Sequence, residues 1–393
     1  MLRVAEIFRV RNIATFLLCL MCITYIPLES RAGVSVIKSV VAVICPLIVA
    51  MYSLKFSKVV LWLSLYFLSV LFSAIFNMDS FRSSTILYLL SFLFYFYTYY
   101  NLIYHEKAFD LEYFTNLLKK IIIVFSVVLL IQQIFIISGI KYFPLINLTQ
   151  VLNRGIGANS LTAEPSVLAR ILTISFLCLL RMYEVKWGRD SVTVEAIFKD
   201  AKWVVLGFLW SMVTMASGTA FVGLAILSLY FVKRRYLFTI MPLMAILYFT
   251  IPYIDYAPLN RAKTTFDAAI TLNADNVIKA DGSAAVRIVP LLNTFNGLDL
   301  SDPEIWFGKG VDSGGEKIHY FSKQNYMGGI SSYGLLSYIF ALIFLFSCVI
   351  HRFISLETLA AFLLVGMTVN NFAYIWGIYL LLTTSRYFIK GEV

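Results

Sequence analysis

The sequence predicts an all-α polytopic membrane protein with about twelve transmembrane helices, and composition is the first observation behind this prediction. Of its 393 residues, 60% are hydrophobic and 16% aromatic, whereas 14% are charged. Soluble domains carry roughly 25% charged residues, so this chain cannot cover a water-exposed surface of the usual kind. The second observation is spacing, because the apolar residues gather into runs near the 20 residues that a bilayer-crossing helix needs. We therefore expect one integral membrane domain over residues 1–393.

The apolar runs form two groups separated by a long polar stretch. The first group covers residues 12–27, 39–54, 59–76, 83–104, 121–140, 165–180, 203–216, 219–232 and 237–253. The second group covers residues 333–350, 358–369 and 372–384. This even total predicts that both chain termini lie on one side of the membrane.

Basic residues occur in alternate loops, which predicts the orientation. They lie at both termini and in the loops that follow the second, fourth, sixth, eighth and tenth runs; examples are Arg3, Arg9, Arg11, Lys55, Lys58, Lys107, Lys119, Lys120, Lys233, Arg234, Arg235, Arg352, Arg386 and Lys390. Short loops rich in Lys and Arg stay cytoplasmic, so we expect both termini inside. The net charge of +10 therefore reflects topology. Because this charge is scattered over many loops and forms no stripe, we expect no nucleic-acid partner.

The stretch 203–232 allows two interpretations. One long tilted helix is possible, and so are two short helices interrupted at Ser217, Gly218 and Thr219. A single helix would put Lys202 and the basic run 233–235 on opposite sides of the membrane, whereas two helices keep both inside. We therefore favour two helices.

Two long loops are expected on the outer side, at residues 140–164 and 254–332, and loops of this kind commonly carry function. The second contains a turn and helix start at Asp281-Gly282-Ser283, followed by an apolar helical run to Phe295. Acidic and basic residues nearly cancel in this loop, so particular arginines would have to hold any anion there. Arg287 is the candidate.

Cysteine and histidine positions predict neither disulfides nor a metal site. The five cysteines all fall in expected membrane helices, where a thiol behaves as a small apolar group. The histidines His105, His319 and His351 are too far apart in sequence for a zinc cluster. We expect no cofactor.

Charged residues gather around the start of the sixth expected helix. Pro165 suits the first helical position, so Glu164 would be the N-cap, which favours a carboxylate and leaves it at the membrane surface to orient or deprotonate an acceptor hydroxyl. Arg170 would lie roughly 8 Å further along the helix. A charge at that depth is costly unless it faces a wet cavity or a bound anion. Guanidinium groups bind phosphate in a bidentate manner, so Arg154, Arg170 and Arg287 suit a lipid diphosphate.

A purely structural interpretation stays open for each of these residues. Glu164 could simply cap its helix, Arg170 could pair with a buried acid, and Arg154 could be solvated. His319 could equally be an ordinary exposed loop histidine.

Several short motifs resemble one family. Arg154-x-x-Gly157, followed by Glu164-Pro165-Ser166 and Ala169, looks like the signature of Wzy-type O-antigen and capsular polysaccharide polymerases. Further motifs similar to the second outer loop and next helix of that superfamily are Gly282-Ser283 with Arg287, Trp306-Phe307-Gly308-Lys309-Gly310, Asn325-Tyr326 and Tyr333-Gly334-Leu335-Leu336. The resemblance covers the chain only loosely outside these motifs.

The resemblance implies an inner-membrane glycosyltransferase of GT-C-like polymerase and ligase architecture. Such an enzyme moves a growing glycan from undecaprenyl diphosphate to an incoming lipid-linked repeat unit at the periplasmic face, inverting the anomeric centre without a metal. It implies Glu164, Arg287 and His319 as catalytic residues. Substrate-binding roles would fall to Arg154, Gly157, Arg170, Lys309, Gln324 and Asn325. Partners would be undecaprenyl-diphosphate-linked glycans, membrane lipids and a chain-length-regulating co-polymerase.

Two departures from the family pattern bear on the choice of activity. Related ligases that attach glycan to lipid A core usually show His-Asn where this chain has Gln324-Asn325, which favours a polymerase over a ligase. His319 lies five residues earlier, so the ligase alternative stays open. Relatives also often carry an arginine after the serine of Ser217-Gly218-Thr219, so one diphosphate contact is missing here.

Two other classes of protein compete with this interpretation. Twelve helices with both termini inside also describe secondary transporters and lipid-linked oligosaccharide flippases. The absence of an internal repeat, and the few ionisable residues at mid-depth, argue against transport. A non-catalytic scaffold of an export complex would leave Arg170 unexplained.

Overall fold

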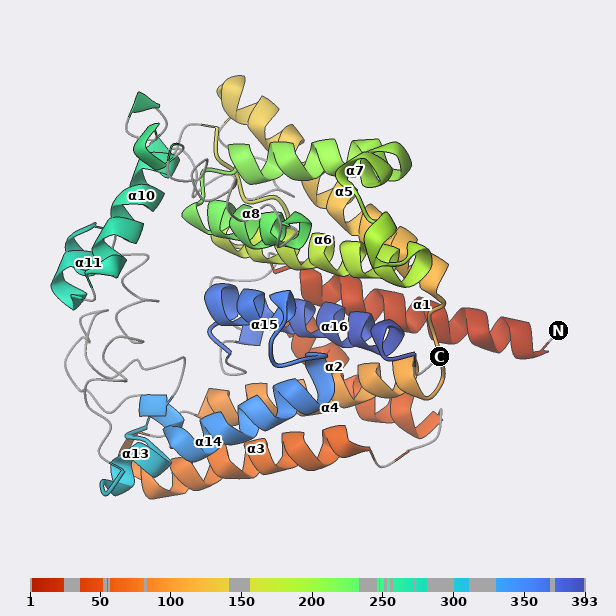
Figure 1. Cartoon of the computed structure of the whole chain (residues 1–393). Helices are drawn as coiled ribbons and strands as arrows, with labels where there is room; N and C mark the ends of the chain where they lie inside the picture. The colour runs from red at the N-terminus through yellow and green to blue at the C-terminus, as the bar shows by residue number, and fades with distance from the viewer. Residues whose placement is uncertain are drawn as a thin grey trace.

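The structure is a computed structural model of the chain, and all the regular elements among the residues it describes are helices (Figure 1). It describes residues 2–24, 36–51, 55, 57–80, 83–140, 156–232, 246, 248–250, 253–254, 257–271, 273–280, 300–310, 330–367 and 372–391.

The helices before residue 240 are α1 (Leu2–Cys22), α2 (Val36–Met51), α3 (Lys58–Phe76), η1 (Met78–Ser80), α4 (Ser83–Tyr104), α5 (Leu111–Ile137), α6 (Pro165–Trp187), η2 (Arg189–Ser191), α7 (Val194–Thr214) and α8 (Gly218–Phe231). Those after residue 250 are α10 (Ala257–Ile270), α11 (Ala274–Ala280), α13 (Pro303–Phe307), α14 (Ile330–Phe344), the π-helix η5 (Leu345–Val349), α15 (Leu356–Ala360), the π-helix η6 (Ala361–Val365) and α16 (Phe372–Ile389).

Among the described residues, five helices are long and apolar enough to cross a membrane. They are Lys58–Phe76, Ile86–Tyr104, Leu111–Ile137, Pro165–Trp187 and Ser332–Val349. Two shorter apolar helices, Gly218–Phe231 and Leu356–Val365, accompany them. The expected all-helical character is therefore confirmed, and the helices fit a polytopic membrane protein. Each expected segment coincides with a helix except 237–253, which lies mostly outside the described residues.

Two helix boundaries show how local chemistry decides where a helix begins. We expected the fifth helix to begin at residue 121, but α5 begins at Leu111 because the Asp110 carboxylate accepts a hydrogen bond from the Tyr113 N–H at 2.7 Å. Between α7 and α8 the chain turns at Met215–Ser217, where Ala216 has a φ of 56°. The stretch 203–232 therefore forms two helices, as expected.

The centre of the bundle is built from α6 and α16, which pack against each other. Nearly all side chains of α6 from Val167 to Tyr183 are buried. In Figure 1, α5, α7 and α8 lie on one side of this pair, and α2, α3, α4 and α14 lie on the other. Small residues allow close approach, since a Cβ at Gly377 of α16 would lie 2.8 Å from the Met21 carbonyl oxygen of α1.

Both chain termini lie at one end of the bundle, and α10, α11 and α13 lie at the other (Figure 1). Ion pairs join helices at the end with the termini. Arg11 of α1 contacts Asp110 at 2.9 Å, and Lys119 of α5 contacts Asp200 of α7 at 2.6 Å. We call the end of the bundle with the chain termini the terminal end, and the end with α10, α11 and α13 the loop end.

At the loop end, α13 packs on the start of α14 by direct contact between their backbones, at positions where both segments have glycine. Gly308 and Gly334 both have positive φ, and a Cβ at Gly308 would lie 2.6 Å from the Ser332 carbonyl carbon. The Asn77 side chain, just after α3, donates to the Gly308 carbonyl at 3.1 Å. The two motifs that contain these glycines, 306–310 and 333–336, therefore meet at the end of α3.

This contact predicts a large effect of Gly334→Ala. The backbone at Gly334 (φ 83°, ψ 164°) is almost limited to glycine, and an added Cβ would also clash with the Trp306 backbone. We expect a loss of roughly 2–6 kcal/mol, from about 1–3 kcal/mol of strain and about 1–3 kcal/mol of overpacking. Thermal unfolding in detergent, followed with a thiol-reactive dye that detects buried cysteines such as Cys22 and Cys178, measures this loss.

Gly188→Ala is the matched control, because Gly188 has nearly the same backbone geometry (φ 82°, ψ 152°) but open space where its Cβ would lie. The Gly188→Ala variant should lose only the stability that backbone strain costs, about 1–3 kcal/mol. Equal melting temperatures for the two variants would contradict the close packing of α13 on α14.

Candidate functional site

The segment 156–164, which leads into α6, is irregular in structure yet mostly buried. We expected a loop on the outer side over residues 140–164, and residues 141–155 lie outside the described part. From Gly157 to Ser160 every residue is buried, and so is Thr162. Backbone without helical hydrogen bonds is tolerated inside a membrane protein only where protein groups or water satisfy it.

Gln132 of α5 satisfies part of this backbone. Its side-chain carbonyl accepts from the Ser160 N–H at 2.7 Å, and its amide donates to the Ser160 carbonyl at 3.0 Å. The Ser160 hydroxyl in turn donates to the Phe125 carbonyl of α5 at 2.7 Å. Because Phe125 lies about 18 Å along α5 from its end at Ile137, the segment enters the bundle deeply.

The rest of the segment is bonded internally and to the end of α1. Asn159 donates to the Thr162 carbonyl at 2.5 Å, and the Thr162 hydroxyl donates to the Asn159 carbonyl at 2.6 Å. The Thr24 N–H donates to the Leu161 carbonyl at 3.1 Å, while the Thr24 hydroxyl accepts from the Ala163 N–H at 3.1 Å. These hydrogen bonds fix the segment within the bundle. We call residues 156–164 the re-entrant loop.

Glu164 ends the re-entrant loop and is the N-cap of α6, with Pro165 as its first helical residue, as the sequence predicts. Its carboxylate makes no capping hydrogen bond within the described residues; instead the Ser166 hydroxyl donates to it at 3.1 Å. Glu164 is exposed. The carboxylate is therefore accessible at the mouth of a polar loop, and simple capping does not account for its position.

Arg170 is half-buried on α6 and lies level with the start of α8. Tyr230 of α8 reaches the Leu180 carbonyl at 3.5 Å, and Gly223 packs against Thr173, so both contacts join residues fifty positions apart. The two helices therefore run parallel and in register. This register brings Arg170 beside the first turn of α8, where Gly218 has open space around it.

The other predicted site residues divide into two sets. Gly157 is buried in the re-entrant loop, and Lys309 is exposed at the loop end with its ammonium 2.5 Å from Glu304. Arg154, Arg287, His319, Gln324 and Asn325 lie outside the described residues. Of the predicted site residues, the described part therefore places Gly157 in the re-entrant loop, Glu164 at the N-cap of α6 and Arg170 six residues further along that helix.

A second charged cluster, which sequence reasoning missed, lies at the opposite end of α6. The buried Glu357 of α15 receives two hydrogen bonds from Arg181, at 2.5 and 3.0 Å. Arg181 also contacts Glu184 at 2.5 Å, and Arg189 contacts the same carboxylate at 2.7 Å. The buried acid Glu357 of α15 thus pairs with Arg181 of α6. The signal in the sequence was the spacing Arg181-x-x-Glu184, which suits an ion pair on one helix face.

The re-entrant loop was also missed as a buried element. Its signal was Gln132-Gln133, two adjacent amides inside an apolar helix, because polar side chains at such depth usually bind a neighbouring segment. Gln133 uses its amide on α7, accepting from the Trp210 indole N–H at 2.9 Å and donating to the Thr214 hydroxyl at 2.8 Å.

No group of three or more metal-ligating side chains occurs among the described residues. Comparison with protein-family models, with curated proteins and with solved structures found no match for this chain. The function therefore has to be inferred from the arrangement of its own residues.

The re-entrant loop predicts that Gln132→Leu destabilises the protein. The variant keeps the side-chain volume but leaves the Ser160 N–H and carbonyl without partners in a dry interior, which costs about 1–3 kcal/mol for each unsatisfied group. A melt followed by circular dichroism in detergent measures the loss. Gln133→Leu is the control, since its partners are only partly buried, and a larger loss in this control would contradict the assignment.

The Lys119–Asp200 pair predicts a pH-dependent stability. Burial raises the pKa of Asp200, but hydrogen bonds from Lys119 and from the Tyr183 hydroxyl outweigh it, and the pKa lies below the ordinary value. Stabilisation by a carboxylate of lowered pKa is present above its unfolded pKa of about 4 and is lost as pH falls below that value. The melting-temperature difference between wild type and Asp200→Asn should therefore shrink from pH 7 to pH 3. A constant difference would contradict this.

Proposed function

We propose that this protein is a glycan polymerase similar to the Wzy-type enzymes, acting on lipid-linked repeat units at the periplasmic face of the bacterial inner membrane. The observation that carries the proposal is the re-entrant loop, which ends in the exposed carboxylate of Glu164, with the half-buried Arg170 six residues further along α6. In an apolar bundle, such a polar entry is costly to build and suits a site for a polar substrate that arrives from the membrane.

The orientation follows from the distribution of charge. The terminal end carries Arg11, Lys119, Arg181 and Arg189. Positively charged loops favour the cytoplasm, so we assign the terminal end to the cytoplasm and the loop end to the periplasm. With twelve spans, both termini are cytoplasmic, and Glu164 and Lys309 face the periplasm.

The head of α6 suits a diphosphate group. Arg170 supplies a guanidinium that matches phosphate oxygens. The parallel helices α6 and α8 both start at this level, and the unpaired N–H groups of a helix start attract anions. The open space at Gly218 leaves room for a ligand where relatives often carry an arginine. The start of α8 compensates for that missing side chain.

The reaction needs little beyond positioning and charge. A hydroxyl of the incoming repeat unit attacks the anomeric carbon of the growing glycan, the bond from that carbon to the diphosphate oxygen breaks, and undecaprenyl diphosphate leaves. Glu164 accepts the hydroxyl proton, and Arg170 stabilises the charge that develops on the leaving diphosphate. We assign Arg287 and Arg154 to the same diphosphate, and His319 with Gln324, Asn325 and Lys309 to the acceptor sugar.

The test is polymerisation by the purified protein. Incubation with undecaprenyl-diphosphate-linked repeat units alone should give a ladder of glycans on a gel. Glu164→Gln should slow ladder formation at least 100-fold, the lower range for loss of a general base, and Arg170→Ala should do the same through loss of charge stabilisation. Arg170→Lys should retain part of the activity, because it keeps the charge but loses the bidentate geometry.

Glu112→Gln is the matched control, since Glu112 is an exposed carboxylate in the first turn of α5 at the terminal end. It should form the ladder at the wild-type rate. Transfer to a lipid A core acceptor without a ladder would replace the polymerase with a ligase. Movement of the lipid-linked unit across a vesicle bilayer without a ladder would replace it with a flippase.

A further inference from the structure

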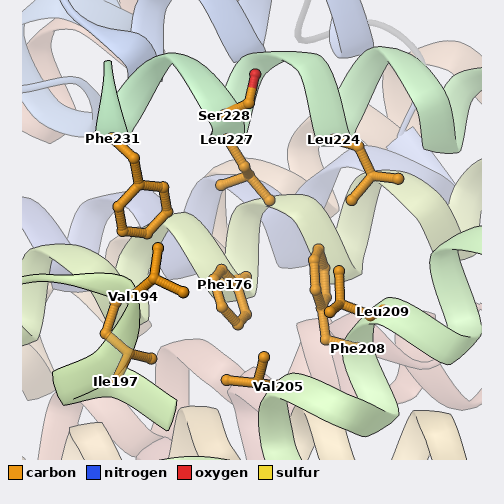
Figure 2. A pocket seen from close by; sticks show the side chains of 10 residues that line it. All are labelled: Phe176, Val194, Ile197, Val205, Phe208, Leu209, Leu224, Leu227, Ser228 and Phe231. Carbon is orange, nitrogen blue, oxygen red and sulfur yellow. The ribbon is translucent and has the colours of Figure 1, made fainter. Parts of the chain in front are cut away.

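A cavity of about 210 Å³ lies between α6, α7 and α8 (Figure 2). Nine of its ten lining side chains are apolar, and the tenth, Ser228, donates its hydroxyl to the Ala225 carbonyl at 2.7 Å. The wall therefore offers no spare polar group to water. Apolar cavities of this size stay dry and accept apolar guests.

Helix α7 is interrupted next to the cavity. Ala201 has non-helical backbone angles (φ −139°, ψ 43°), midway between the lining residues Ile197 and Val205. On the opposite wall, Phe176 of α6 stacks on Phe208 of α7 with ring centroids 4.3 Å apart. The stacked rings of Phe176 and Phe208 hold each other in position, and the space between these rings and the interrupted part of α7 stays open.

The rim of the cavity lies on a surface suited to lipid. Of the lining residues, Val194 is 60% exposed and Leu209 is 44% exposed. The neighbouring surface of α7 also exposes Leu206, Trp210 and Val213. A helix that shows such a row of large apolar side chains faces acyl chains in a membrane, so the cavity opens towards lipid.

A charged residue, Arg189, lies near one end of the cavity. Val194 and Phe231 line this end, and Arg189 contacts Tyr230, the residue before Phe231. The Arg189 guanidinium pairs with Glu184 at 2.7 Å, donates to the Tyr230 carbonyl at 2.8 Å and lies 3.9 Å from the centre of the Tyr230 ring. Half of its side chain remains exposed, which leaves one side of the guanidinium accessible to a phosphate. A half-exposed guanidinium at the end of an apolar slot matches the arrangement of phosphate and acyl chain in a phospholipid.

We propose that this cavity binds one acyl chain of a phospholipid from the leaflet at the terminal end, with the phosphate of that lipid at Arg189. The lipid would fill the space beside Ala201 and join α7 to α6 and α8. The lipid phosphate, at Arg189, would lie about the length of α8 away from Arg170, whereas the near end of the cavity, at Phe176, lies about 9 Å along α6 from Arg170. The phosphate position is therefore separate from the diphosphate site. The proposal needs only that these helices lie in a membrane, and it stands whether or not the protein is a polymerase.

The test fills the cavity in the full-length protein. The protein is purified in detergent and freed of lipid, and dioleoylphosphatidylethanolamine is then added while melting temperature and bound lipid are followed by a thermal scan and native mass spectrometry. Wild type should gain stability saturably and retain one lipid. Val205→Trp, which occupies the cavity, should weaken the lipid effect at least tenfold while melting no earlier than wild type without lipid.

Val213→Trp is the matched control, because it lies two turns further along the same face of α7 and outside the cavity. It should respond to lipid as wild type does. Ser228→Phe, on the α8 wall, blocks the same space from an exposed position and serves if Val205→Trp does not fold. An undiminished lipid effect in a folded cavity-filling variant would overturn the proposal.

A second comparison tests the phosphate. Dioleoylphosphatidic acid and dioleoylglycerol share the same acyl chains and differ in the phosphate, so the first should bind at least tenfold more tightly. Equal binding of the two would overturn the assignment of the phosphate to Arg189.

Discussion

The pairing of Gln132 with Ser160 is the constraint on which the head of α6 depends. An irregular backbone cannot lie among apolar helices unless its N–H and carbonyl groups find partners, and one amide side chain supplies both for Ser160. The hydroxyl of Ser160 then reaches the backbone of α5. Because these bonds fix the re-entrant loop, they also fix the direction from which the chain enters α6, and with it the positions of Glu164 and Arg170.

The two ends of α6 have different roles for the same physical reason. A charge inside a bundle must be paired, or must face water or a ligand. At the terminal end, Arg181 is held between Glu184 and Glu357, and the resulting ion pairs join α6 to α15. At the loop end, Glu164 is exposed and Arg170 lies beside two helix starts that favour anions. The end of α6 near Arg181 is therefore held by ion pairs, whereas the other end presents an exposed carboxylate.

Glycine contacts complete the frame at the loop end. Gly308 and Gly334 let α13 and α14 meet backbone to backbone, and Asn77 ties this contact to α3. The segments that flank residues 311–329 are therefore held at one place on the bundle. Lys309 lies next to Gly308 in this contact and pairs with Glu304.

The sequence by itself determined the class of protein, because composition and the length of apolar runs reflect the thickness of a bilayer directly. It also predicted the N-cap at Glu164 from the local pair Glu164-Pro165, and it favoured a break in the stretch 203–232, because a single helix would put Lys202 and the basic run 233–235 on opposite sides of the membrane. Only the tertiary structure decided that residues 156–164 turn back into the bundle, that Arg170 lies beside the start of α8, and that Glu357 pairs with Arg181. Each of these depends on a partner from a distant part of the chain, and no local pattern of residues specifies which partner that is.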